Sequence, residues 1–270
     1  MSTIAIQNLT MDYTERNKSF TALENVSFTV NSGEFVSIIG SSGCGKSTLL
    51  SIVEGIRKPS DGNIKIDDIE IDGTGKDRGV VFQHYSLFPW MTARKNIAFG
   101  VKQVQRGLRS SERLKIADEF LEKVGLSEFK NKFPCQLSGG MQQRVAIARA
   151  LAMNTNILLM DEPFGAIDAK NRTVLQELLL KLWEGDGSEE KKTVMFVTHD
   201  IDEAILLSDR IILMSANPGK VKQEFKVPFE RPRNRAELVQ TKEYSYFRNQ
   251  LMNVFYDDVA LKIGGSEVVL

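Results

Sequence analysis

The chain has 270 residues and a formal net charge of zero, because 35 Lys and Arg balance 35 Asp and Glu. Hydrophobic residues make up 42 % and charged residues 26 %, an ordinary globular balance for one large domain or two small ones. Nucleic-acid binders usually carry a basic excess, so the composition argues against that class unless a local basic patch exists.

Two cysteines are too few for a disulfide framework and fit a reducing cytosol. The N-terminus has no basic stretch followed by a long apolar core, so we expect no signal peptide. No apolar run approaches the roughly 20 residues of a spanning helix. We therefore expect a protein that is soluble by itself and reaches a membrane only through a partner.

The first third of the chain predicts strands on either side of one helix. Short alternating apolar runs between residues 3 and 35 predict antiparallel strands, and residues 34–39 predict a buried strand that runs into Gly40. Residues 64–71 predict a hairpin around Asp67 and Asp68. The apolar residues that predict the helix recur at helical spacing after Gly40: Leu49, Ile52, Val53 and Ile56.

The rest of the chain alternates helices with apolar strands. Residues 90–155 are mostly helical in pattern, and residues 157–160 form a wholly apolar run before two acids. A leucine-rich helix around 175–182 precedes predicted strands at 193–198 and 211–214, with a helix from about residue 202 between them. This alternation predicts an α/β fold with a mainly parallel sheet covered on both faces.

Residues 216–270 are predicted to form a polar tail that contains one amphipathic helix. We expect this tail to pack on its own core or on a second copy of the chain. Four apolar residues mark the helix: Phe247, Leu251, Val254 and Phe255.

Residues 40–47 match the phosphate-loop pattern G-x-x-x-x-G-K-[ST] in full, with a buried strand before it and an amphipathic helix after it. Its glycines let backbone N–H groups face phosphates, Lys46 supplies a positive charge, and the Ser47 hydroxyl suits Mg²⁺. The alternative is a glycine-rich turn that matches by chance. The residues expected to contact ATP here are Gly40, Ser41, Ser42, Gly43, Cys44, Gly45, Lys46, Ser47 and Thr48.

Two acids and a histidine follow predicted strands. Asp161 is placed to hold Mg²⁺, and Glu162 is a candidate general base for the attacking water. The alternative is a solvated acidic turn. His199 ends the strand at 193–198, at the edge where open α/β sheets bind ligands, so we expect it to contact the γ-phosphate and the water rather than serve a purely structural role.

Residues 137–144, Leu-Ser-Gly-Gly-Met-Gln-Gln-Arg, predict a second helix start with exposed backbone N–H groups. This segment and the motifs above resemble the ATP-binding cassette (ABC) family over about residues 1–215. The resemblance implies a RecA-like P-loop NTPase core with an N-terminal antiparallel β subdomain and an inserted helical subdomain at about 88–155. It also implies a head-to-tail dimer in which one chain's signature caps the ATP of the other through three residues: Ser138, Gly139 and Gly140.

The resemblance carries over further residues. Tyr13 matches the aromatic residue that stacks on adenine, although it could be a strand residue that only packs on the β layer. Gln83 matches the glutamine that reaches Mg²⁺ and the water, with a plain polar loop residue as the alternative. Residues 164–168 match the loop that links two cassettes, with Gly165 and Ile167 replacing the usual Ser and Leu.

The resemblance therefore implies an ATPase with ATP and Mg²⁺ as cofactors. The catalytic set that it implies is Glu162, His199, Gln83 and Lys46. The metal ligands that it implies are Ser47, Gln83 and Asp161.

Within the family, the chain lacks the long coiled coils of chromosome ATPases and the second cassette of translation factors. The aromatic stretch at 85–92 predicts a docking surface for a membrane subunit or, about equally, core of the helical subdomain. The sequences of this stretch and of the tail resemble those of ATPases of nitrate, sulfonate and taurine importers. We thus expect a peripheral protein on the cytoplasmic face of the membrane, bound to permease subunits and served indirectly by a solute-binding protein.

Two alternatives remain open. The first is a soluble ABC ATPase that acts on nucleic acid or ribosomes, which the zero net charge and the lack of coiled coils disfavour. The second is a small-molecule kinase on a phosphate-loop fold, which leaves residues 137–142 without a role.

Overall fold

The structure is a computed structural model that describes residues 2–15, 18–83, 86–165, 167–184 and 191–264. Its centre is a six-stranded sheet in which every strand is parallel to its neighbours except β10, which pairs antiparallel with β9. The strands follow the order β10 (Val221–Lys226), β9 (Arg210–Met214), β3 (Phe35–Gly40), β8 (Thr193–Val197), β7 (Ile157–Asp161) and β6 (Arg78–Val81).

A second, antiparallel sheet is built from the N-terminal part of the chain. Its order is β2 (Lys18–Val30), β1 (Ile4–Glu15), β4 (Asp61–Ile66) and β5 (Ile69–Glu70). The turn between β4 and β5 holds Asp67 and Asp68 at φ 50° and 65°, the left-handed backbone of a tight hairpin. The hairpin and the antiparallel strands predicted from the sequence are confirmed.

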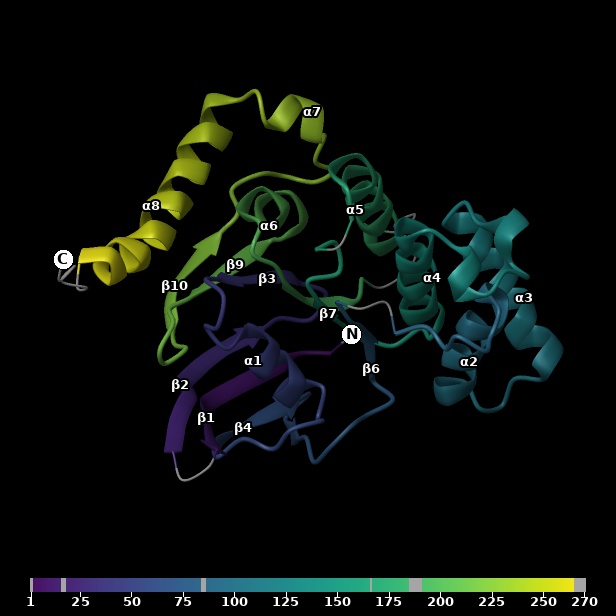
Figure 1. Cartoon of the computed structure of the whole chain (residues 1–270), viewed down its shortest axis with the longest axis horizontal. Helices are drawn as coiled ribbons and strands as arrows, with labels where there is room; N and C mark the ends of the chain where they lie inside the picture. Colours follow the sequence, from purple (N-terminus) through teal and green to yellow (C-terminus); the bar gives the residue numbers. More distant parts are fainter. Residues whose placement is uncertain (1, 16–17, 84–85, 166, 185–190, 265–270) are drawn as a thin grey trace, which may run out of the picture.

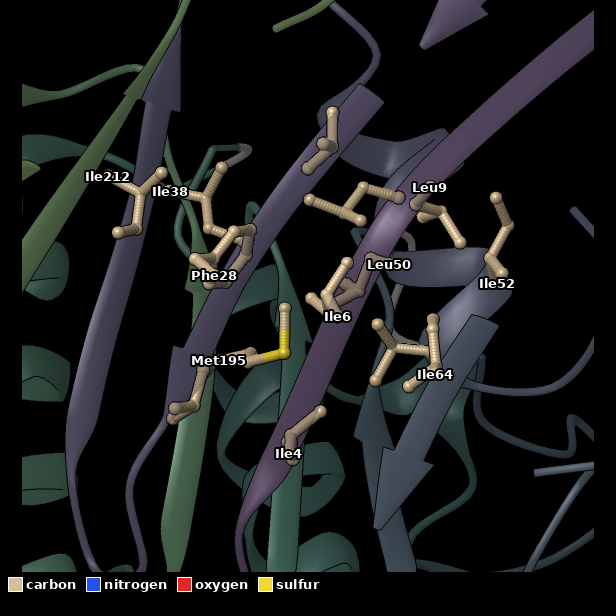
Figure 2. Packing of buried hydrophobic residues seen from close by; sticks show 14 of the residues in the cluster. Ile4, Ile6, Leu9, Phe28, Ile38, Leu50, Ile52, Ile64, Met195 and Ile212 are labelled. Atoms are coloured by element: carbon tan, nitrogen blue, oxygen red, sulfur yellow. The ribbon is translucent and has the colours of Figure 1, made fainter. Parts of the chain in front are cut away.

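Helix α1 (Lys46–Val53) lies between the two sheets (Figure 1). Its Leu50 and Ile52 share one buried cluster with Ile6 of β1 and Met195 of β8, so the helix joins both layers (Figure 2). The helix is shorter than its apolar pattern predicted. Gly55 has φ 80° and ends it, which leaves Ile56 58 % exposed instead of buried on the helix.

The opposite face of the main sheet is covered by α4 (Gly139–Ala152) and α5 (Ala169–Glu184). Helices α2 (Ala93–Val104) and α3 (Ser110–Lys123) pack with α4 into a lobe at one end of the molecule (Figure 1). Short 3-10 turns at Ser127–Phe129 and Pro134–Gln136 connect α3 to α4. Because α4 contributes to both clusters, it joins the lobe to the sheet.

The C-terminal segment packs on its own chain. It contains β10, a short helix α7 (Arg235–Leu238) and the long helix α8 (Lys242–Gly264), which lies beside α6 (Ile201–Leu207) and β9 (Figure 1). The predicted amphipathic helix is present, but the sequence analysis missed β10 and α7. The pattern of β10 gives little signal, since it is an edge strand with exposed Gln223 and Glu224 and no fully buried residue.

The packing of α8 on the core predicts a stability effect. Leu251 is fully buried among α6, β9 and Val227, so Leu251→Ala should lower the free energy of unfolding by about 2–4 kcal/mol. Tyr256 on the same helix is 51 % exposed, and Tyr256→Ala should change it by less than about 0.5 kcal/mol. Urea titration of the two variants measures the difference, and equal midpoints would contradict this packing.

Candidate nucleotide-binding and active site

The predicted phosphate loop spans the gap between the end of β3 at Gly40 and the start of α1 at Lys46. Gly43 and Gly45 have φ 78° and 88°, which only glycine adopts without strain. A Cβ atom on Gly45 would also lie 2.5 Å from Leu23 Cδ2, so close packing against β2 adds to the need for glycine. The loop therefore turns its backbone at positions that the motif specifies.

Lys46 is 6 % exposed, and its ammonium group is held by the loop itself. Its Nζ donates to the carbonyl oxygens of Gly40 at 2.8 Å and Ser41 at 3.1 Å. Cys44 is fully buried, and burial raises the pKa of its thiol, so the thiol stays protonated. Cys44 thus fills space beneath the loop and is no reactive group at its mouth.

The Ser47 hydroxyl donates a hydrogen bond to Asp161 Oδ1 at 3.1 Å, which joins the start of α1 to the end of β7. Burial raises the pKa of Asp161, the hydrogen bond from Ser47 lowers it, and the charge of Glu162 raises it further. A hydroxyl and a carboxylate on adjacent elements form an oxygen donor set that suits Mg²⁺, which takes its remaining ligands from phosphates and water. The residues present therefore fit this metal.

Gln83, Glu162 and His199 converge from three different strand ends. Glu162 Oε2 lies 3.2 Å from His199 Nδ1 and accepts a hydrogen bond from Gln83 Nε2 at 3.5 Å. Glu162 itself has φ 40°, a left-handed backbone that is rare for residues other than glycine and is found at functional sites. The structure thus brings together three residues that are separated by up to 116 positions in the sequence.

A pocket of about 820 Å³ lies in front of these groups. The predicted residues that line it are Tyr13, Ser42, Gly43, Gly45, Lys46, Ser47, Thr48, Gln83, Glu162 and His199. Four predicted residues are not among the described lining residues: Gly40, Ser41, Cys44 and Asp161.

An aromatic pair forms one wall of the pocket. The rings of Tyr13 and Phe20 stack with centroids 5.3 Å apart, and the hydroxyls of Tyr13 and Thr48 are 3.4 Å apart. Phe20 is 57 % exposed, although exposing an aromatic ring to water is costly. An exposed ring in this position offers a stacking surface to a flat ring of a ligand. The sequence analysis missed five lining residues: Thr14, Phe20, Thr21, Ala22 and Asn217. Phe20 could have been found from its register, since it pairs directly with Tyr13 across the hairpin.

The predicted signature lies at the start of α4. Ser138 caps the helix by accepting a hydrogen bond from the Met141 amide at 3.3 Å, and Gly139 and Gly140 are half-exposed. None of residues 138–140 is among the described residues that line the pocket of the same chain. The chain thus has two separate places with the backbone geometry that suits an anion, the phosphate loop and the N-terminus of α4.

The aromatic stretch at 85–92 divides between core and surface. Leu87 packs against the helical lobe, whereas Trp90 is 69 % exposed and rests on Phe88 at 5.5 Å between ring centroids. The buried Asn96 holds this stretch, because its side-chain amide donates to the carbonyls of residues 88, 91 and 92. Tyr85 and, in the predicted inter-cassette loop, Ala166 lie outside the described residues.

Comparison with known proteins decides the family. Residues 23–165 match the family model described as ABC transporter. The chain belongs to the ABC transporter family. Within the part of the chain that the structure describes, no helix has the length and apolar content to span a bilayer.

Curated relatives cover nearly the whole ABC chain. An uncharacterized ABC transporter ATP-binding protein of Methanocaldococcus jannaschii is 46 % identical over 95 % of this chain and 92 % of its own length. The nitrate import ATP-binding protein NrtD of Synechococcus elongatus is 47 % identical over 88 % of this chain and 85 % of its own. The bicarbonate transport ATP-binding protein CmpD of the same organism is 43 % identical over 95 % and 91 %.

Solved structures agree. The ATP-binding cassette MJ0796, in a dimeric post-hydrolysis state with ADP and phosphate, matches with a TM-score of 0.74 and 41 % identity over 84 % of this chain and all of that chain. A further dimeric structure of the same bacterial ABC transporter cassette matches with a TM-score of 0.75. The α/β cassette fold and the ATPase activity predicted from the sequence are therefore confirmed.

A buried acid near the site gives the ABC cassette a pH-dependent stability. Glu54, which follows α1, is 7 % exposed, and burial together with the nearby Asp161 raises its pKa to about 7. Between pH 4.5 and 7 the unfolded chain releases this proton while the folded chain retains it, so stability falls as pH rises through this window and stays low above it.

Glu54→Gln removes this titration. We expect the variant to be more stable than the wild type at pH 8 by about 1–3 kcal/mol and nearly equal to it at pH 4.5. Urea titrations at both pH values measure the difference, with Glu119→Gln at an exposed position of α3 as the matched control. A wild-type curve that rises from pH 5 to 8 relative to Glu54→Gln would contradict the assignment.

Proposed function

We propose that this ABC cassette is the ATPase subunit of an importer and that it works as a head-to-tail homodimer with ATP between two copies. The observation that carries the proposal is the separation of the pocket from residues 138–140 within one chain. A second copy in the opposite orientation would supply its α4 N-terminus to the γ-phosphate. The dimeric state of the matching MJ0796 cassette supports this arrangement. The proposal divides the chain into a nucleotide-binding domain at 1–215, with a helical subdomain at about 88–155, and a C-terminal tail at 216–270.

In the proposed reaction, Tyr13 and Phe20 hold the adenine while the loop amides and Lys46 hold the phosphates. Glu162 takes a proton from water, whose oxygen attacks the γ-phosphorus, and the bond to the bridging oxygen of ADP breaks. His199 and Gln83 orient Glu162 and the water from either side, since both contact the same carboxylate oxygen. Mg²⁺ held by Ser47, Asp161 and Gln83 would supply charge neutralisation of the phosphates.

Hydrolysis can drive the opening of the dimer only if ATP binds the closed dimer more tightly than the open one. The γ-phosphate is the group that touches both copies in this scheme, so its release removes the attraction that holds the interface. The permease subunits bound to the two cassettes would then move with them between inward- and outward-facing states.

The importer role rests on the relatives and on one surface. NrtD is a nitrate import protein and CmpD a bicarbonate transport protein, which supports a small-anion importer such as one for nitrate, sulfonate or taurine-like solutes. The exposed Trp90 beside Phe88 forms an apolar surface on the helical lobe for a permease helix. We place the protein on the cytoplasmic face of the membrane, with a solute-binding protein as an indirect partner. The alternative, action on nucleic acid or ribosomes, is not favoured by these relatives.

The proposed base gives a direct test. Glu162→Gln keeps the side-chain size but removes proton acceptance, so kcat for ATP should fall at least about 100-fold while ATP still binds. The variant should therefore accumulate as an ATP-loaded dimer, measured by size-exclusion chromatography with light scattering. Lys46→Ala, which loses the phosphate contact, should stay monomeric under the same conditions. Rapid turnover by Glu162→Gln, or a monomer in saturating ATP, would refute the scheme.

The proposed docking surface gives a second test. Trp90→Ala should weaken co-purification with the proposed permease subunits at least about tenfold, because buried aromatic anchors dominate interfaces. The ATPase rate of the isolated subunit should stay within about twofold of the wild type. Phe129→Ala, which removes another exposed aromatic residue of the lobe, is the matched control. Unchanged co-purification of Trp90→Ala would count against docking at this surface.

A further inference from the structure

The C-terminal tail holds both ends of α6, the helix that begins two residues after His199. At its first turn, Asp202 accepts hydrogen bonds from Tyr244 Oη at 2.7 Å and Arg248 Nε at 2.6 Å. At its last turn, Arg233 donates to the carbonyl oxygens of residues 205 and 206 at 3.0 and 3.1 Å and of residue 208 at 2.6 Å. The tail thus fixes the position of this helix on the sheet.

A buried chain of hydrogen bonds runs from the tail toward the catalytic site. Arg235 of α7 donates to Gln176 Oε1 of α5, and Gln176 Nε2 donates to Glu203 Oε1 of α6 at 2.6 Å. The second carboxylate oxygen of Glu203 accepts a hydrogen bond from the hydroxyl of Thr198, the residue immediately before His199. Gln176, Thr198 and Glu203 are each at most 4 % exposed, so water cannot replace these partners.

The same helix face also holds the residue after His199. Arg172, one turn before Gln176 on α5, donates to Asp200 Oδ2 at 3.4 Å and to the carbonyl of Ile167 at 3.3 Å. The Asp200 amide donates to the Thr198 hydroxyl at 3.0 Å. Both neighbours of His199 are therefore fixed by side chains from α5 and α6.

His199 depends on this support, because packing does little to hold its ring. The side chain is 60 % exposed, and its Nδ1 lies 3.2 Å from Glu162 Oε2. A small cavity of about 10 Å³ is lined both by Glu162 and His199 and by Thr198 and Glu203. The backbone at 198–200 consequently sets where the imidazole meets Glu162.

We propose that Gln176, Glu203 and Arg235 are positioning residues for His199, so that the C-terminal tail contributes to the rate of ATP hydrolysis. The inference rests on the proposed role of His199 beside Glu162. None of the three positioning residues lines the nucleotide pocket among the described residues, so each acts through Thr198 and the backbone. A carboxylate whose two oxygens are both bonded cannot turn without breaking one of the bonds, which makes the chain a rigid link.

A double-mutant cycle tests the link with the full chain. Arg235→Ala removes the hydrogen bond from the C-terminal tail to Gln176. Thr198→Val removes the hydroxyl that donates to Glu203, with little change in side-chain shape. Each should lower kcat about tenfold and leave KM for ATP within about twofold, and the double variant should fall no further than either single one. Arg235→Lys, which retains a donor, should recover part of the loss.

The control separates a rate effect from loss of tail anchoring. Arg248→Ala cuts another contact between the tail and α6 but leaves the chain to Thr198 intact, so its kcat should stay within about twofold of the wild type. Thermal unfolding of all variants shows that each is folded at the assay temperature. If Thr198→Val does not fold, Gln176→Met takes its place in the cycle.

Three outcomes are distinguishable. Equal kcat for Arg235→Ala and Arg248→Ala, or a double variant whose loss is the product of the single losses, overturns the inference. His199→Ala is measured in the same assay. If it retains the wild-type kcat, the proposed role of His199 fails, whereas a large loss there beside an unaffected Arg235→Ala removes the positioning role alone.

Discussion

The parallel pairing of β3, β8, β7 and β6 is the constraint on which the site depends. Because parallel strands end at the same edge of the sheet, the residues that follow them meet there although they are far apart in sequence. The pairing of Asp161 with Val197 sets Glu162 and His199 side by side. The distance between Glu162 Oε2 and His199 Nδ1 is 3.2 Å. The fully buried strands β3 and β8, apolar apart from Ser37 and Thr193, make this register costly to change, so the hydrophobic core holds the geometry of the candidate site.

The edge of the sheet also accumulates negative charge. Asp161 interacts with Lys46, Glu162 and the buried Glu54, and the pKa of both Asp161 and Glu54 is raised by burial first and by a neighbouring carboxylate second. A triphosphate adds further negative charge to this edge, so its binding requires positive charge from elsewhere. The α1 helix start supplies part of it.

The sequence predicted the site better than the periphery. Few folds combine a full phosphate loop, an acid pair after an apolar strand and a histidine at a strand end. The structure brings Lys46, Glu162 and His199 to one pocket. The aromatic partner Phe20 and the strand β10 escaped prediction, because one depends on hairpin register and the other is a charged edge strand. The hydrogen bonds from Arg235 to Thr198 join α7, α5 and α6 to the residue that follows β8, and no local pattern encodes such long-range pairing.

The charge at the edge of the sheet gives the proposed dimer a physical reason. The N-terminus of α4, with Ser138 as its cap, offers unpaired backbone amides and the positive end of a 14-residue helix, but it lies away from the pocket of its own chain. In the proposed head-to-tail dimer, a second copy would place that helix end where the phosphate charge is largest. Under that proposal, binding of ATP and formation of the dimer would stabilise each other, and hydrolysis, which divides the charge between ADP and phosphate, would weaken both together.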